Sequence, residues 1–138
     1  MEQSLEVRDV LSSLVETFGT PRMGLAFTDA VAAEPGVLVV GTDAAEWWDN
    51  PGDVLRALQA QSGELQGTAA TVSHCQGWAQ GDIGWGAVKA DIAFAGGPAA
   101  SIRITAVLAR RPGRWKIVQF HGSVGAANEE VVGKELTV

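Results

Sequence analysis

Apolar residues recur at helical spacing through the N-terminal part of the chain. The first run stands three or four residues apart, with polar residues between its members: Val7, Leu11, Leu14 and Phe18. This spacing puts all of them on one face and predicts an amphipathic helix that ends near Gly19. Thr20 and Pro21 then supply an N-cap and the residue favoured at the first helical position. A second helix is therefore expected to run to about Ala33.

A break and a buried strand come next. Pro35 and Gly36 end the second helix, because proline restricts the residue before it and glycine frees the backbone after it. Residues 37–40 read Val-Leu-Val-Val and predict a buried strand. We expect an irregular connection over residues 41–49.

A capped start marks the third helix. Asn50 precedes Pro51 and Asp53, a combination typical of a helix N-terminus. Apolar positions continue at helical spacing beyond it. The prediction is a helix that runs through Gln61 and is shorter than the first.

The pattern changes in the second half of the chain. From Thr68 onward, β-branched and aromatic residues recur between glycine-containing turns. They predict four successive antiparallel strands at about residues 68–78, 83–94, 99–110 and 115–124. Helices followed by a meander of strands indicate an α+β fold. Because long strands twist strongly, we expect a cone-shaped α+β barrel, with the N-terminal helices packed on a strongly curved, mainly antiparallel sheet around an apolar cavity.

Length, composition and charge narrow the class of protein. The 138 residues are 46% hydrophobic and 19% charged, which favours a single globular domain, 1–138, and no membrane partner. The net charge of −6 repels polyanions, so no nucleic-acid partner is expected. The basic cluster at residues 110–114 is expected to be a solvated hairpin tip. Because the first residues lack a basic segment followed by an apolar one, we expect a cytoplasmic protein.

No cofactor or metal motif is evident in the sequence. Cys75 is the only cysteine, which excludes an internal disulfide and a metal site of several thiolates. His74 has no His, Asp or Glu neighbours at ligand spacing, and no glycine-rich phosphate loop follows a strand. We therefore expect neither a metal nor a cofactor, and read Cys75 as a small buried strand residue.

Several segments together resemble a known family. They are residues 39–43, 46–48, 81–85, 103–108 and 115–123. In this order, over nearly the whole chain, they resemble SnoaL-like domains of the nuclear-transport-factor-like and ketosteroid-isomerase-like superfamily. The resemblance implies the cone-shaped fold and a homodimer. It leaves the reaction open, because isomerases, cyclases, dehydratases, epoxide hydrolases and binding modules share this scaffold.

The resemblance also implies where an isomerase would carry its catalytic groups. In the ketosteroid-isomerase-like enzymes a carboxylate base follows the first strand, and hydroxyl or acid donors lie deeper in the pocket. Here Gly41 and Thr42 stand near the base position with Asp43 following, and the chain contains no tyrosine. An isomerase mechanism thus lacks its expected groups.

Tryptophan side chains are candidates for the walls of the pocket. Trp47 and Trp48 are adjacent on a segment expected to be irregular, so their side chains should point in different directions. Trp85 lies on a predicted strand. An indole suits a core as well as a pocket wall, because it buries a large area and keeps one hydrogen-bond donor. Both alternatives stay open for these three residues.

One face of the last strand changes from apolar to polar. With a period of two, Trp115 and Ile117 share a face with Gln119, His121 and Ser123. We expect the three polar residues to line the pocket near its rim. His121 is then a general base or hydrogen-bond donor, or else an imidazole satisfied by a neighbour. A one-residue slip of the hairpin register would change which neighbours share a face with His121.

Arg103 is the third polar candidate. It lies between two isoleucines in a strand expected to neighbour His121, where a guanidinium needs an acidic partner or an anionic ligand. Asp43 or Glu46 is the expected partner in a structural ion pair. The alternative is that Arg103 recognises a substrate carboxylate.

Three functions follow from these residues. The first is a domain that binds a small apolar or weakly acidic molecule, as a homodimer because three short helices cannot cover the sheet. The second is a cofactor-free isomerase, cyclase or dehydratase in which Asp43 or His121 moves a proton and Arg103 steadies negative charge. The third is a purely structural homodimerisation module.

Overall fold

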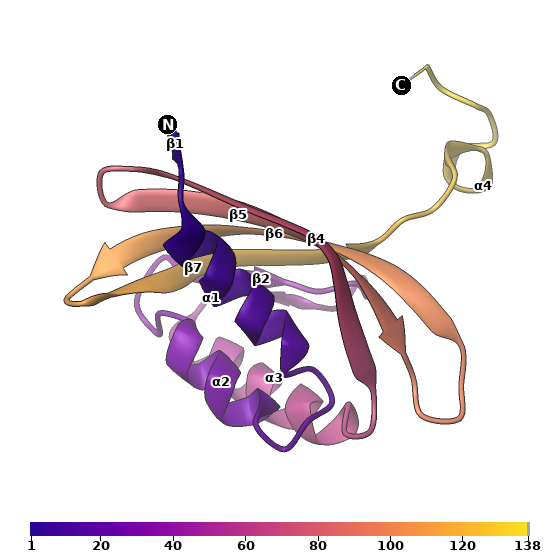
Figure 1. Cartoon of the computed structure of the whole chain (residues 1–138). Coiled ribbons are helices and arrows are strands. Elements are labelled where there is room, and N and C mark those ends of the chain that lie inside the picture. Colours follow the sequence, from indigo (N-terminus) through magenta and orange to yellow (C-terminus); the bar gives the residue numbers. More distant parts are fainter. Residues whose placement is uncertain (138) are drawn as a thin grey trace.

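The computed structural model describes residues 1–137 as a layer of helices on one curved sheet (Figure 1). The helices are α1 (Leu5–Glu16), α2 (Met23–Ala30), α3 (Pro51–Glu64) and α4 (Asn128–Val132). The strands are β1 (Glu2–Gln3), β2 (Leu38–Val40), β3 (Trp47–Trp48), β4 (Ala69–Gln80), β5 (Ile83–Ala93), β6 (Ala99–Arg111) and β7 (Arg114–Val124). No helix within residues 1–137 is long and apolar enough to span a membrane.

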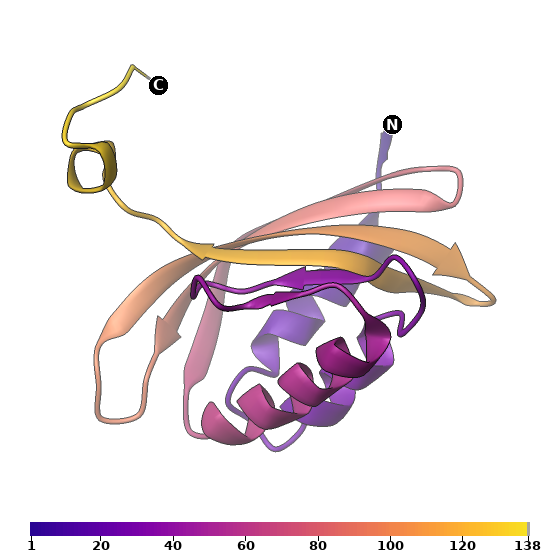
Figure 2. The ribbon, with the colours of Figure 1, turned by 180° about the vertical axis from the view of Figure 1, so that it is seen from behind.

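The sheet has the order β1-β4-β5-β6-β7-β2-β3. Strands β4 to β7 form the expected antiparallel meander, and β2 joins its far edge in parallel with β7. Helices α1, α2 and α3 all cover one face of the sheet, which curls toward them (Figure 2). The predicted cone-shaped α+β barrel is thereby confirmed. We call the uncovered face of β4 to β7 the outer face.

One predicted helix start, at Asn50, is confirmed, and another, at Thr20, is wrong. The Ser4 and Asn50 side chains cap α1 and α3. Each accepts a hydrogen bond from the backbone N–H three residues later in the chain. Helix α2 begins at Met23 and not at the predicted Pro21, because the Thr20 hydroxyl donates to the Thr17 carbonyl in the preceding turn. Helix α3 has 14 residues and α1 has 12, so the prediction of a shorter third helix was wrong.

Three short elements were not predicted from the sequence. The connection after β2 was expected to be irregular, but Trp47 and Trp48 form β3 in a hairpin with β2. Strand β1 and helix α4 were not predicted either. Elements of two to five residues are too short to show a periodicity. Helix α4 and the segment after it project away from the sheet on the side opposite the other helices (Figure 1).

A stripe of glycines in β4 and β5 allows α1 to approach the sheet closely. A Cβ atom at Gly86 would lie 2.3 Å from Leu11 Cδ1, and one at Gly84 would lie 2.9 Å from Val7 Cγ2. At Gly77 it would lie 2.4 Å from the backbone nitrogen of Arg8. Val7 and Leu11 are fully buried as a result. The glycines therefore set the distance between helix and sheet.

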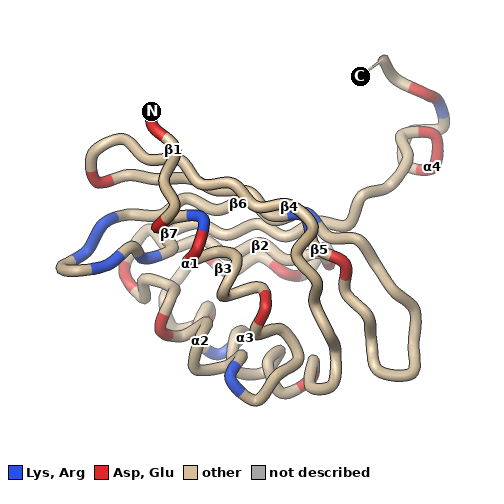
Figure 3. Tube along the Cα trace, in the orientation of Figure 1, with Lys and Arg blue, Asp and Glu red and all other residues tan. Residues whose placement is uncertain are grey.

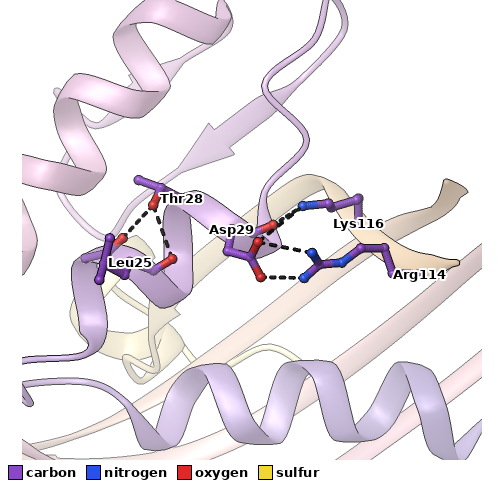
Figure 4. A network of polar contacts seen from close by, with 6 residues as sticks. Leu25, Thr28, Asp29, Arg114 and Lys116 are labelled. Atoms are coloured by element: carbon purple, nitrogen blue, oxygen red, sulfur yellow. Dashed lines mark hydrogen bonds and ion pairs between the residues drawn. The ribbon is translucent and has the colours of Figure 1, made fainter. Parts of the chain in front are cut away.

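The basic cluster at the β6–β7 hairpin was expected to be a solvated tip. Its three arginine side chains are 40–49% exposed, and each is paired with a carboxylate, Arg110 with Asp82 at 3.7 Å. Charged residues of both signs meet at this end of the molecule (Figure 3). Arg114 pairs with Asp29 at the end of α2, and Lys116 donates to the Asp29 carbonyl (Figure 4). Arg111 pairs with Glu34. These hydrogen bonds lower the pKa of both carboxyl groups.

Candidate functional site

An apolar cavity lies between the concave face of the sheet and helices α2 and α3. Its volume is about 190 Å³. Most of its wall is aliphatic or aromatic: Phe18, Met23, Phe27, Val39, Val40, Trp48, Leu58, Leu65, Ile92, Phe94, Ala100, Ile102, Ile104, Phe120 and Val124. The remaining lining residues are Gly41, Thr42, Glu46, Gln61, Thr68 and Gly122. The cavity therefore combines a large apolar wall with a small set of polar groups.

A bulge in β7 decides which of its residues face the cavity. Leu108 pairs with Ile117, but the next residue back on β6, Val107, pairs with Gln119, so Val118 has no partner in the ladder. The extra residue reverses the alternation. Ile117 is buried before the bulge, and Phe120 is buried after it.

The bulge places the predicted polar residues of β7 on the outer face. Gly122 lines the cavity together with Phe120, whereas Gln119, His121 and Ser123 do not. His121 is exposed and pairs with the exposed Thr105 of β6. The uniform alternation expected from Trp115 to Ser123 is therefore corrected: the face is split at Val118.

The three candidate tryptophans lie in different places. Trp48 lines the cavity, whereas its neighbour Trp47 is 62% exposed. The expectation that the two side chains point in different directions agrees with this arrangement. Trp85 lies on the outer face, where its ring stacks on Trp78 with the centroids 6.2 Å apart. Only Trp48 of the three is thus in a position to contact a molecule in the cavity.

Arg103 and Asp43 also lie outside the cavity wall. Arg103 is exposed on the outer face between Lys89 of β5 and Ser123 of β7, and no carboxylate of residues 1–137 lies within ion-pairing distance. The expected ion pair of Arg103 with Asp43 or Glu46 is therefore not formed. Asp43 is exposed in the β2–β3 connection, and its carboxylate accepts a hydrogen bond of 2.8 Å from the Ala45 N–H.

The charged group at the cavity is Glu46, which was predicted only as a partner for Arg103. Its Oε1 accepts from the Asp43 N–H at 2.9 Å, and its Oε2 accepts from the Gln61 side chain of α3. Gly41 leaves room for it, since a Cβ atom there would lie 2.6 Å from Oε2. The carboxylate is thus held by two elements at the edge of an apolar space. The available signal was the motif itself, an acid three residues beyond a Gly-Thr-Asp turn.

Thr68 is another polar residue of the cavity wall, and unlike Glu46 it has no hydrogen-bond partner for its side chain among the described residues. Thr68 is 9% exposed, and its Oγ1 has no partner within residues 1–137. Gly19 packs against it, because a Cβ atom there would lie 2.4 Å from Oγ1. A buried hydroxyl without a partner is costly, so a polar group on a bound molecule would find a favourable contact here.

The described part of the chain offers no other chemical centre near the cavity. Residues 1–137 contain no group of three His, Cys, Asp or Glu side chains able to hold a metal ion. Cys75 lies in β4 beneath α1, and burial raises the pKa of its thiol. Thr42, Glu46, Gln61 and Thr68 are therefore the polar side chains of the cavity wall that can orient a ligand.

Comparison with known proteins identifies the family of this chain. The family model described as "SnoaL-like domain" matches residues 8–127. No curated protein matches the sequence.

Solved structures share the fold at low sequence identity. An NTF2-like protein of unknown function from Pseudomonas putida has a TM-score of 0.76 at 15% identity, over 95% of this chain and 91% of that one. A candidate dehydratase of the NTF2-like family from Streptomyces avermitilis has a TM-score of 0.76 at 19% identity, over 88% and 95%. A candidate ketosteroid isomerase from Parabacteroides distasonis has a TM-score of 0.69 at 15% identity, over 91% and 95%.

Proposed function

The chain belongs to the SnoaL-like domain family of the NTF2-like superfamily, and we propose that it binds a small, mainly apolar molecule in the cavity beneath its curved sheet. The fold alone assigns no activity, because this scaffold serves many functions. The observation that carries the proposal is the cavity of about 190 Å³ with an apolar wall and four polar side chains, Thr42, Glu46, Gln61 and Thr68. Ligand sites commonly combine such walls with a few polar groups that fix orientation.

The volume sets the size of the ligand. An engineered apolar cavity of about 150 Å³ is known to bind benzene. The larger cavity here suits a molecule of one or two fused rings, or an aliphatic chain of similar volume. Trp48 and Phe120 supply aromatic surface for contact with it.

A substitution that fills the cavity tests this proposal. Gly122 lines the cavity, and a Cβ atom there meets no other atom within 4 Å. Gly122→Val therefore inserts methyl groups into the open space and suits a strand. The matched control is Ser123→Val, which adds a similar side chain to the outer face of the same strand. Titration of both variants with naphthalene, followed by NMR, should show binding in the control and none in Gly122→Val. Equal binding by both variants, or no binding by the natural sequence, would refute the proposal.

The alternative is a cofactor-free isomerase, cyclase or dehydratase. One observation favours it: the Glu46 carboxylate borders an apolar cavity, where such a group can accept a proton. In this alternative Asp43 contributes its backbone N–H, which donates to the Glu46 carboxylate. His121 and Arg103 are on the outer face and take no part. Elimination of water from a β-hydroxyketone, detected as enone absorbance and lost in Glu46→Gln, would favour the enzyme. Recovery of the compound unchanged would favour the binding protein.

A homodimer through the outer face is the second part of the proposal. Three cross-strand pairs on this face lie next to one another: Trp85 with Val107, Ala87 with Thr105, and Lys89 with Arg103. A two-fold axis near the middle pair would bring the cations of one copy over Trp85 of the other, and this cation–π contact is favourable. The face is therefore complementary to a second copy of itself.

Sedimentation velocity at micromolar concentration tests the dimer. Thr105→Lys adds a positive charge where the axis would bring two copies together, and it should shift the protein to monomers. Gln59→Lys is the control, because it makes the same change of charge on α3, on the other side of the molecule. A monomer for the natural sequence, or equal behaviour of both variants, would contradict this interface. The purely structural module would then lose its support as well.

We also retain the cytoplasm as the proposed location. Its support is the lone, unpaired Cys75, which a reducing compartment would preserve. Cell fractionation of the expressed full-length protein tests it, and recovery outside the cytoplasmic fraction would contradict it.

A further inference from the structure

We infer that the cavity selects neutral molecules carrying one hydroxyl or N–H donor and rejects carboxylates of the same shape. This inference rests on the proposed binding function and specifies the chemical class of the ligand. It narrows the expectation of an apolar or weakly acidic molecule, because the charged group at the cavity is an acid.

The charge of the wall is the first argument. Glu46 is the one charged residue among the described residues that line the cavity, and no lysine, arginine or histidine is among them. A ligand carboxylate would have to leave water and then approach a group of like charge in an apolar surrounding. Arg103 and His121 were the basic residues predicted for the site. Both are on the outer face, so neither can neutralise the charge of a ligand carboxylate in the cavity.

The hydrogen-bonding capacity of Glu46 is the second argument. The Asp43 N–H and the Gln61 side chain each donate to one of its oxygen atoms. An ionised carboxylate has about four acceptor sites, so acceptor capacity is left on both oxygens. Only a donor can use it, which favours a hydroxyl or an N–H group on the ligand.

The backbone around Glu46 is shaped to keep the carboxylate in place. A side chain at Gly41 would collide with it, since a Cβ atom there would lie 2.6 Å from Oε2 and 2.8 Å from the Glu46 Cβ. Gly41 is therefore a positioning residue whose replacement should displace the carboxylate without changing the charge of the protein.

The unpartnered hydroxyl of Thr68 supplies an independent observation. It lies in the wall of the same cavity, and its side chain is almost fully buried. A hydroxyl can donate as well as accept. A ligand that carries a polar group is thus better matched to this wall than a pure hydrocarbon.

Three probes of one shape test the inference: naphthalene, 2-naphthol and 2-naphthoate, each titrated into the full-length protein by calorimetry. We expect 2-naphthol to bind about tenfold more tightly than naphthalene, because a hydrogen bond to a charged group is a strong one. We expect 2-naphthoate to bind more weakly than both. Glu46→Gln should raise the affinity for 2-naphthoate about fivefold or more and remove most of the preference for 2-naphthol.

Two further variants complete the test. Glu64→Gln is the matched control, because it makes the same change of charge on α3 outside the cavity lining, and it should leave all three affinities unchanged. Gly41→Ala should reduce the preference for 2-naphthol while the acid is still present, which keeps the test decisive if Glu46→Gln does not fold.

The outcomes separate this inference from the proposed function. Binding of 2-naphthoate as tight as that of 2-naphthol would overturn the inference and leave the binding function intact. So would binding of all three probes with equal affinity, or an equal response of Glu46→Gln and Glu64→Gln. Binding of none of the probes would overturn the binding function and the inference with it.

Discussion

Replacing Gly86 with alanine should destabilise the protein, because α1 packs directly against the glycine. A Cβ atom there would lie 2.3 Å from Leu11 Cδ1 and 2.9 Å from the carbonyl oxygen of Gln76. Leu11 is fully buried, so its side chain cannot turn into solvent. Overpacking of this kind costs about 1–3 kcal/mol. Loss of backbone freedom in the unfolded chain offsets about 0.5–1 kcal/mol of that. The difference leaves an expected net loss between about 0 and 2.5 kcal/mol, centred on about 1 kcal/mol.

The control for this substitution lies on the same face of the same sheet. Gly122→Ala makes an identical chemical change, but the new methyl group meets no atom within 4 Å. It should therefore be neutral or stabilise the protein by about 0.5 kcal/mol. Urea unfolding, monitored by tryptophan fluorescence and by far-UV circular dichroism, measures the midpoint of both variants. The dependence of the unfolding free energy on urea concentration, m, should be the same for both. Equal midpoints for Gly86→Ala and Gly122→Ala would refute the close packing of α1 on the glycine stripe.

Four further predictions concern the hydroxyl in the cavity, the paired hairpin, the outer face and the number of domains. Thr68→Val should stabilise the unliganded protein by about 1 kcal/mol in urea unfolding, because it removes a buried hydroxyl without a partner; a loss of stability would contradict this. The pKa of Asp29 is lowered in the folded state, chiefly by the hydrogen bond from Arg114, so its contribution to stability is present above the unfolded-state pKa and is lost as the pH falls through the folded-state value. NMR titration of Arg114→Gln should show that pKa rising toward about 3.9, and an unchanged titration would speak against the pair. His121→Ala should leave the affinity for naphthalene unchanged in calorimetry, since the side chain is on the outer face; a large loss would place it in the site. A single domain should unfold in one transition, with fluorescence and circular dichroism coinciding, and two separated transitions would count against it.

Local sequence patterns determined most of the secondary structure. The caps at Ser4 and Asn50, the apolar stripe of α1 and the glycine-containing turns of the meander act within a few residues. Such signals depend on local geometry and hydrogen bonding, which the sequence displays directly. The α+β order and the cone-shaped barrel follow from them, because long twisted strands must cover an adjacent layer of helices.

The tertiary structure alone decided which side chains meet at the cavity. One unpaired residue, Val118, turns Gln119, His121 and Ser123 to the outer face, and no periodicity in the sequence shows where a ladder skips a residue. Glu46 reaches Gln61 across fifteen positions of the chain, and Gly41 is needed only because that carboxylate folds over it. A site of this kind depends on register and on long-range contacts. The residue types were visible in the sequence, and their faces were set by the pairing of the strands.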